Sequence, residues 1–229
     1  PFPLPNTYAQ LLTSLNFKRI PDQSYPSNGI YSTTIQADLQ NQILEIVRLH
    51  FASLHANLIH NCAIIVSDNA SGNVLSYIAN TPDGFGENAN NVDMNQVFRS
   101  TGSLLKPLLY GLALDRGLIH QSTLLEDVPT FIQGFKPENI NYTYDGVVPA
   151  DESLRRSLNI PFVRLLQEYG VGNFLFQLKK LGMRQLRDDP GFYGLPIILG
   201  TAESSPWQIH TLYHNFALQL NTYNASSKY

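Results

Sequence analysis

The sequence predicts a globular protein that combines α-helices with an antiparallel β-hairpin, and three patterns support this prediction. Apolar residues recur at helical spacing between Leu39 and Leu58. Two short runs rich in strand-forming residues follow, at 62–66 and 74–79, and turn-forming residues separate them. The segment 103–114 is apolar on nearly every side, which is typical of a helix buried inside a protein.

The composition agrees with a globular protein and excludes several other classes. The chain has 229 residues, of which 43% are hydrophobic and 14% charged, so it can form a core and is not disordered. Its net charge of -3 removes the general electrostatic case for binding nucleic acid or an anionic membrane. Cys62 is the single cysteine, so the chain can form neither an internal disulfide nor a cysteine-based metal site.

The chain is expected to contain a linker followed by one domain. Residues 1–31 are rich in Pro, Asn, Ser and Tyr, which favours a linker preceding the domain. Residues 32–229 are expected to form the domain itself. Because the chain begins with Pro1 and no signal peptide precedes it, it is expected to be an excised piece of a longer protein.

Start and stop signals accompany the predicted helices. Asp38 is placed to cap the first helix, which should end near residues 55–60. Pro107 is tolerated only in the first turn of a helix, so the buried helix should begin near Ser103. Between residues 117 and 149, prolines and glycines predict mostly irregular structure. Further helical patterns cover residues 150–157, 161–169, 172–181 and 206–220.

Ser103 and Lys106 form the candidate catalytic pair. Residues three apart on a helix share a face, so the hydroxyl and the amine are expected to meet. At the start of a helix, free N–H groups and the helix dipole favour the oxyanion that a serine attack creates. Desolvation by the neighbouring leucines and proline would lower the pKa of Lys106 and let its neutral amine act as a base.

A simpler explanation of the same spacing is a serine that caps the helix and a lysine that reaches solvent. For most S-x-x-K sequences that explanation holds. It is disfavoured here because the apolar helix leaves Lys106 no easy route to water. No other S-x-x-K occurs in the chain.

The sequence around this pair resembles a known family. Residues 99–114 read Arg-Ser-Thr-Gly-Ser-Leu-Leu-Lys-Pro-Leu-Leu-Tyr-Gly-Leu-Ala-Leu and are similar to the nucleophile helix of bifunctional, class A penicillin-binding proteins. The similarity spans about residues 31–218, and two stretches, 92–94 and 118–120, lean toward the 1C subtype. Residues 200–203 resemble a turn near the site and are expected to be structural. Other matching stretches lie at 33–40, 115–120, 124–129, 137–139 and 153–166.

Members of this family carry a second motif, S-x-N, on a loop that faces the nucleophile. Four such triplets occur here, and they begin at Ser14, Ser67, Ser71 and Ser157. The first lies in the predicted linker, and turn chemistry explains the next two, although Ser67-Asp68-Asn69 matches the commonest form of the motif letter for letter. The fourth lies after the nucleophile, at a break between two predicted helices. Ser157 and Asn159 are therefore the predicted site residues.

The resemblance implies an α+β fold, the transpeptidase fold that penicillin-binding proteins share with serine β-lactamases. In this fold an antiparallel sheet is flanked by helices, and the helix that carries Ser103 is buried. The family has a third motif, Lys-Thr-Gly, on a strand of the sheet, but none of the six lysines here is followed by Thr-Gly or Ser-Gly. The fold is therefore expected to be truncated before its last strands.

The resemblance also implies the D,D-transpeptidase reaction of peptidoglycan synthesis. Ser103 would attack the D-Ala–D-Ala end of a stem peptide, and Lys106 would accept its proton. Ser157 would pass the proton to the leaving amine, while Asn159 would hold Lys106 and the substrate amide. An amino group of a second stem peptide would then take the acyl group. No metal or organic cofactor is implied, and β-lactams would acylate the same serine.

Two other functions stay open. One is hydrolysis of the same acyl-enzyme, as in a D,D-carboxypeptidase or a β-lactamase. The other is a catalytically inactive binding module, which the missing third motif favours. The parent protein would carry a membrane anchor and an upstream glycosyltransferase domain, and would act on the periplasmic side of the bacterial inner membrane.

A pair of histidines near the C-terminus is the remaining signal. His210 and His214 stand four residues apart, a spacing that can bind zinc. No third ligand accompanies them, so they are expected to lie on an ordinary helix surface.

Overall fold

The computed structural model describes residues 33–81 and 92–226, and these divide into two compact units. Unit 1 combines the residues up to Phe98 with those from Ser205 onward. Unit 2 is the continuous segment Arg99–Ser204. The predicted linker, residues 1–31, lies outside the described residues. No helix in the described part of the chain is long and apolar enough to cross a membrane.

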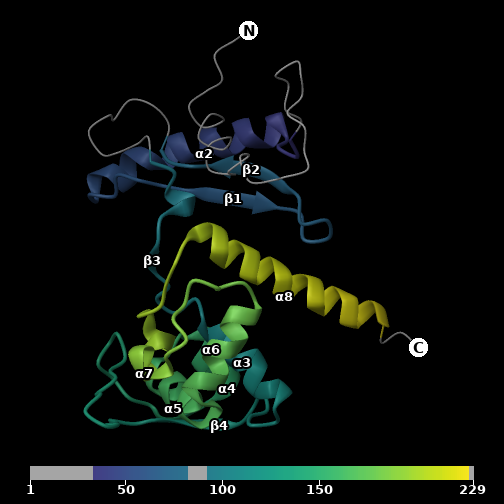
Figure 1. Cartoon of the computed structure of the whole chain (residues 1–229). Coiled ribbons are helices and arrows are strands. Elements are labelled where there is room, and N and C mark those ends of the chain that lie inside the picture. Colours follow the sequence, from purple (N-terminus) through teal and green to yellow (C-terminus); the bar gives the residue numbers. More distant parts are fainter. Residues whose placement is uncertain (1–32, 82–91, 227–229) are drawn as a thin grey trace. The chain divides into compact units, whose positions relative to one another are not determined.

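Unit 1 is built around the predicted β-hairpin. Its strands β1 and β2 pair antiparallel, with Ile65 opposite Tyr77, so the hairpin prediction is confirmed. Helices α2 and α8 both pack on the hairpin, α2 against β2 and α8 against β1 (Figure 1). The elements of unit 1 are α2 (Ala37–Ala56), β1 (Ile64–Ser67), β2 (Val74–Ile78), the short 3-10 helix η2 (Met94–Gln96) and α8 (Pro206–Ser226).

The side chain of Gln40 attaches α2 to the hairpin. Its Nε2 donates to the carbonyl of Tyr77, and its Oε1 accepts from Tyr77 N and from Ser76 Oγ. Gln40 is buried, so these three bonds satisfy a polar group that would otherwise be costly. The prediction of Asp38 as N-cap is wrong, because Gln36 occupies that position and Asp38 lies in the first turn. There its carboxylate still faces the positive end of the helix dipole.

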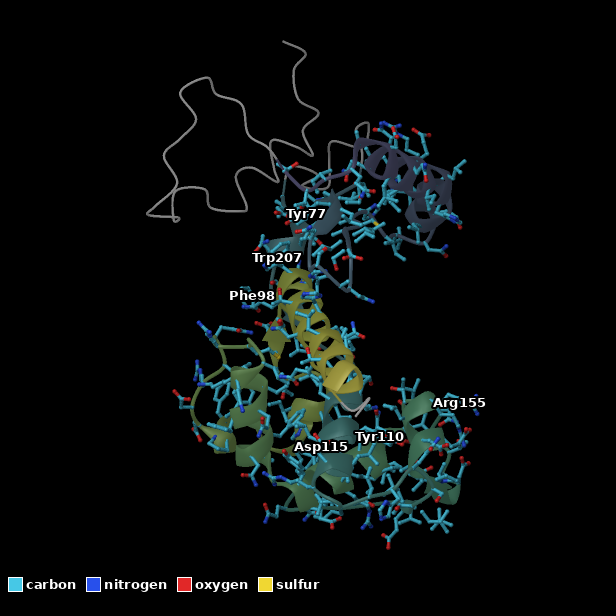
Figure 2. All side chains as sticks on the ribbon, turned by 90° about the vertical axis from the view of Figure 1, so that its right-hand side faces the viewer. Tyr77, Phe98, Tyr110, Asp115, Arg155 and Trp207 are labelled. Carbon is cyan, nitrogen blue, oxygen red and sulfur yellow. The ribbon has the colours of Figure 1, made fainter. Side chains whose placement is uncertain are left out.

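An aromatic contact anchors α8 to the hairpin. Tyr77 of β2 and Trp207 of α8 have ring centroids 6.0 Å apart at an interplanar angle of 59° (Figure 2). Tyr77 belongs to a small buried cluster with Ala79, on which Ile35, Ile65, Val74 and Trp207 pack. Burial of these apolar side chains is what stabilises so small a sheet.

The prediction that His210 and His214 lie on an ordinary helix surface is wrong. Both are half-buried, their rings stack with centroids 6.4 Å apart, and His210 Nε2 lies 2.7 Å from Ser67 Oγ. Burial, and to a lesser degree the neighbouring His214, lowers the pKa of His210. No group of three or more potential metal ligands occurs among the residues the structure describes.

Unit 2 consists mainly of helices, with two short antiparallel strand pairs. Strand β3 (Arg99–Ser100) pairs with β6 (Glu203–Ser204), and β4 (Leu124–Asp127) pairs with β5 (Gly146–Pro149). Strands β4 and β5 were not predicted, since both are short and lie in a segment rich in turn-forming residues. The helices are α3 (Lys106–Asp115), α4 (Ala150–Arg155), α5 (Asn159–Tyr169), α6 (Val171–Lys180), α7 (Pro190–Tyr193) and the 3-10 helix η3 (Leu195–Leu199).

Helix α5 is the centre of unit 2. It packs against α3, α4, α6, η3 and β4, and most of its side chains are buried. Helix α3 is buried as predicted, since Leu109 and Ala113 have no exposed surface and Leu108 is also buried. Figure 2 marks Tyr110 and Asp115 on this helix and Arg155 at the end of α4. The packing of α3 on α5 brings together the start of one helix and the start of the other, and both predicted motifs lie there.

Candidate active site

Ser103 lies in a turn just before α3. The prediction that the helix begins near Ser103 is therefore wrong by three residues. The backbone N–H of Leu104 donates to Thr101 O, and that of Lys106 donates to Ser103 O, so the chain makes tight i to i+3 turns before α3 begins at Lys106. Pro107 stands in the first turn of α3, where its missing N–H is harmless. In such turns residues i and i+3 eclipse, which keeps Ser103 and Lys106 on one side.

Hydrogen bonds to the segment 200–202 hold this turn in place. Ser100 Oγ donates to Gly200 O at 2.7 Å and accepts from Gly102 N at 3.2 Å. Thr101 Oγ1 donates to Ala202 O. Gly200 has a φ of +111°, and a Cβ added there would lie 2.5 Å from Gly102 N. The close approach therefore requires glycine, and it fixes Gly102, the residue immediately before Ser103.

Lys106 is buried and its amine is fully engaged. Its side chain is 1% exposed. The Nζ atom donates to Ser157 O and Asn159 Oδ1, both at 2.7 Å, and lies 3.3 Å from Ser157 Oγ. It also lies 5.8 Å from the centre of the Phe162 ring. Burial lowers the pKa of Lys106 from its ordinary value to about 8, because the charged form loses its hydration.

These three acceptors suit both protonation states of the amine. An ammonium has three N–H groups and can donate to all three oxygens. A neutral amine can donate to the two oxygens at 2.7 Å, which leaves a lone pair for a neighbouring hydroxyl. The hydroxyl of Ser157 can then donate to that lone pair. Lys106 can thus gain and lose a proton without leaving a buried polar atom unpaired.

Ser157 is held in a conformation that serine seldom adopts. Its φ is +55°, in the left-handed region. It stands directly after α4, where Ser157 N donates to Leu154 O and Leu158 N donates to Ser153 O. These two bonds form a Schellman motif, in which the left-handed position is usually glycine. Serine here costs about 1–2 kcal/mol, and it directs both the carbonyl and the hydroxyl of Ser157 at Lys106.

The orientation of the Asn159 amide is fixed by its neighbours. Asn159 Nδ2 donates to Glu138 O at 2.8 Å. A carbonyl can only accept, so the Asn159 NH₂ group must face Glu138 and its Oδ1 must face Lys106 Nζ. The backbone N–H of Asn159 donates to Asn139 Oδ1 at 2.9 Å, which secures the first residue of α5.

Ser103 is a half-buried residue. Neither its hydroxyl nor the Ser103 N–H has a hydrogen-bond partner in the part of the chain that the structure describes. The adjacent Leu104 side chain is 49% exposed, so the turn lies at the surface of unit 2. The structure thus joins Lys106, Ser157 and Asn159 by direct bonds and connects Ser103 to them through the turn.

The other S-x-N triplets lie elsewhere. Those that begin at Ser67 and Ser71 lie at the hairpin of unit 1, where Asp68 accepts from Ser71 N and Oγ. The triplet that begins at Ser14 lies outside the described residues.

Sequence reasoning missed two residues of the site, Asn139 and Asp127. Residues 137–139 were noted only as part of the family resemblance, without a role. No spacing rule links Asn139 to Asn159, since the two are 20 residues apart and only the fold joins them. Asp127 ends a strand that the sequence did not predict.

The comparison with protein families identifies the family to which the chain belongs. The model of the penicillin binding protein transpeptidase domain matches residues 62–194, which include all four predicted site residues and more than half of the chain.

The chain belongs to the penicillin-binding protein transpeptidase family.

Relatives of known name support the assignment of this transpeptidase domain. Penicillin-binding protein 1C of Escherichia coli is 33% identical over 186 residues, covering 81% of the chain and 24% of that protein. Penicillin-binding protein 1A of Neisseria meningitidis is 30% identical over 129 residues, covering 53% of the chain and 16% of that protein. The chain thus spans a quarter or less of the length of these relatives.

Solved structures confirm the penicillin-binding transpeptidase fold. Penicillin-binding protein 1A from Haemophilus influenzae matches with a TM-score of 0.59 and 25% identity, covering 68% of the chain and 23% of that protein. PonA1 from Mycobacterium tuberculosis matches with a TM-score of 0.67 and 21% identity, covering 91% of the chain and 55% of that structure. The α+β fold predicted from the sequence is therefore confirmed.

The left-handed Ser157 gives a first prediction about this transpeptidase domain. Ser157→Ala removes the hydroxyl but keeps the strained backbone, whereas Ser157→Gly removes both. The glycine variant should therefore be more stable than the alanine variant by about 1 kcal/mol. Urea unfolding followed by circular dichroism measures the difference. Equal stability of the two variants would show that no strain is stored at this position.

The close approach at Gly200 gives a second prediction, with Gly182 as matched control. Both glycines have a positive φ, +111° and +124°, but a Cβ on Gly182 would meet nothing within 4 Å. Gly182→Ala should therefore cost about 1 kcal/mol of unfolding free energy from backbone strain alone. Gly200→Ala should cost clearly more, because its Cβ also displaces the Gly102 backbone. If the two losses are the same, the Gly200 contact does not hold the turn at Ser103.

Proposed function

We propose that this chain is the catalytic part of a peptidoglycan D,D-transpeptidase, that residues 32–229 belong to its transpeptidase domain, and that Ser103 is the acylated residue. The observation that carries the proposal is the buried Lys106 amine, which stands one turn from Ser103 and is bonded to Ser157 and Asn159. A lysine whose pKa is lowered to about 8 is partly neutral near pH 7, and a neutral amine can take the serine proton.

In the first half-reaction, Ser103 Oγ attacks the carbonyl carbon of the penultimate D-alanine. The Oγ–H proton passes to Lys106 Nζ, and a C–O bond forms. Ser157 Oγ then relays a proton from the lysine to the leaving nitrogen, so the C–N bond breaks and free D-alanine departs. The distance of 3.3 Å between Ser157 Oγ and Nζ supports this role. The unbonded Ser103 N–H is available to stabilise the oxyanion.

In the second half-reaction, an amino group of another stem peptide attacks the ester. The same groups work in reverse: Lys106 and Ser157 take the proton of the attacking amine, and Ser103 Oγ regains its proton as the ester breaks. A new amide bond results, which is the cross-link. No step requires a metal or organic cofactor, and a β-lactam would acylate Ser103 because its strained amide replaces the D-Ala–D-Ala bond.

The resemblance to class A proteins extends the proposal to the whole protein. We infer an upstream glycosyltransferase domain and a membrane anchor, with the catalytic part on the periplasmic side of the inner membrane. The relatives named penicillin-binding proteins 1A and 1C, each several times longer than the match, support this inference.

A second candidate is an inactive penicillin-binding module. It is favoured by one observation: no lysine in the sequence is followed by Thr-Gly or Ser-Gly, so the third motif of the family does not occur here. Such a module would keep the shape of the site without turnover.

The test is covalent labelling of the full-length protein with a penicillin, followed by intact-mass and peptide mass spectrometry. We expect one adduct, located on Ser103. Ser103→Ala should abolish it, because the variant lacks the hydroxyl that attacks the β-lactam, and in this proposal Ser157 acts as the proton relay and not as the nucleophile. Ser71→Ala, which changes an exposed serine of the unit 1 hairpin, should leave labelling unchanged.

The outcomes separate the candidates. An adduct that persists for hours and an amide product formed with an added acceptor amine support a transpeptidase. Release of the adduct within seconds would indicate a β-lactamase, and release of free D-alanine without amide formation would indicate a carboxypeptidase. Absence of any adduct on the folded, full-length protein would establish the inactive module instead.

A further inference from the structure

Among the described residues, two buried side chains carry a formal charge at neutral pH, Lys106 and Asp127, and each is 1% exposed. Burying a charge is costly unless hydrogen bonds or an opposite charge compensate it. No ion pair joins these two side chains in the part of the chain that the structure describes. They are instead connected through two asparagines.

The connection consists of three hydrogen bonds. Asp127 Oδ1 accepts from Asn139 Nδ2 at 2.7 Å. Asn139 Oδ1 accepts from the backbone N–H of Asn159 at 2.9 Å. Asn159 Oδ1 accepts from Lys106 Nζ at 2.7 Å. We call Asp127, Asn139, Asn159 and Lys106 the relay.

The direction of every bond in the relay is fixed. Asn139 Nδ2 also donates to Thr143 O at 2.9 Å, and both of its partners can only accept. The Asn139 oxygen must therefore face Asn159. The second oxygen of Asp127 accepts from Asp145 N at 3.0 Å, so each oxygen of this carboxylate accepts a hydrogen bond. Asn139 is 3% exposed, and a flipped amide would leave buried groups unpaired.

We propose that Asp127 and Asn139 are positioning residues of the transpeptidase site, which hold the start of α5 so that the Asn159 oxygen meets the Lys106 amine. The proposal rests on the proposed function, because it assigns these residues to the reaction of Ser103. Asp127 and Asn139 touch neither the nucleophile nor the amine. They act through Asn159, which Glu138 O orients from the other side.

Other charged groups near the relay are paired with one another. Arg156 pairs with Asp145, Lys136 with Glu138, and Arg164 with Glu126. Each of these pairs is partly exposed and screened by solvent. Around Lys106 itself the contacts are the two oxygens of Ser157, the Asn159 oxygen and the Phe162 ring. Asp127 is therefore the buried carboxylate that the relay joins to the amine, and no cation pairs with it among the described residues.

Exchanging the side chains of Asp127 and Asn139 distinguishes a positioning role in the reaction from a role in folding alone. In Asp127→Asn, the new amide has one oxygen for two donors, Asn139 Nδ2 and Asp145 N, so one donor always meets another donor. In Asn139→Asp, two carboxylates come into contact. Each single variant should slow penicillin acylation of Ser103 about 10- to 100-fold, the loss expected for a broken buried bond to a charged group.

The double variant Asp127→Asn/Asn139→Asp should recover most of the limiting rate at high pH, although Thr143 O loses the donor that Asn139 Nδ2 supplies. The new amide at position 127 can donate to the new carboxylate at position 139 and accept from Asp145 N, and that carboxylate can accept from Asn159 N. The negative charge now lies one link closer to Lys106 and favours its ammonium form. The rate of acylation should rise with pH around a midpoint near 8 in the unchanged protein, and around a higher midpoint in the double variant.

The control for charge alone is Asn141→Asp, which adds a carboxylate at an exposed position two residues from Asn139. It should change neither the rate nor the midpoint. All rates are measured by mass spectrometry on full-length protein across a pH series, with circular dichroism confirming the fold of each variant. Should a single variant fail to fold, the folded double variant and its midpoint carry the test.

Three results would overturn the proposal: folded single variants that acylate at the unchanged rate, a folded double variant as slow as the singles, or a restored rate with an unmoved midpoint. The last would mean that the residues serve folding only. Absence of an adduct on the unchanged protein would be a different failure, since it would contradict the proposed function before any variant is compared.

Discussion

A lysine amine that is almost completely removed from water, without a carboxylate bonded to it, is the constraint on which the rest of the site depends. Such an amine must find hydrogen-bond acceptors or lose its proton. Here it has acceptors, and its pKa is also lowered. The acceptors come from the loop between α4 and α5, through the carbonyl and hydroxyl of Ser157 and the oxygen of Asn159. The same burial brings the pKa of Lys106 to about 8, so the amine exchanges protons near neutral pH.

Backbone positions of unusual geometry occur beside Ser103 and at Ser157. Gly102, directly before Ser103, and Ser157 both have positive φ values, and Gly200 approaches Gly102 too closely for any side chain. A serine at the left-handed position after α4 lowers stability relative to glycine, and its hydroxyl and carbonyl both point at Lys106. Strain of this kind persists where the surrounding structure over-determines the conformation and where function requires a side chain.

Much of the fold could be predicted because it rests on local patterns. The hairpin, the buried helix α3, and the helices predicted at 161–169 and 172–181 follow from periodicity and turn chemistry. The start of α3 was predicted three residues too early, because Pro107 limits where a helix can begin but does not require that the preceding turn be α-helical. The strands β4 and β5 escaped prediction because long-range pairing, and not their own sequence, makes them strands.

Site residues that lie close together in the sequence could be predicted, whereas those joined only by the fold could not. Ser103 and Lys106 are close in the chain, and Ser157 and Asn159 were found by a motif that the resemblance supplied. Ser67-Asp68-Asn69 shows that the motif alone misleads, since its serine bonds His210 in unit 1. Asp127 and Asn139 could not be found in this way, because their link to the amine exists only through the tertiary structure.

The most direct test of the proposed chemistry is the protonation of Lys106 itself. Lysine labelled with ¹⁵N and ¹³C would give one side-chain signal for each of the six lysines of this chain. The signal that disappears in Lys106→Arg would be that of Lys106. In a pH titration followed by nuclear magnetic resonance, we expect a midpoint near 8 for Lys106, caused by its burial. A midpoint near the ordinary value of about 10.4 would show a solvated amine and contradict its role as the base.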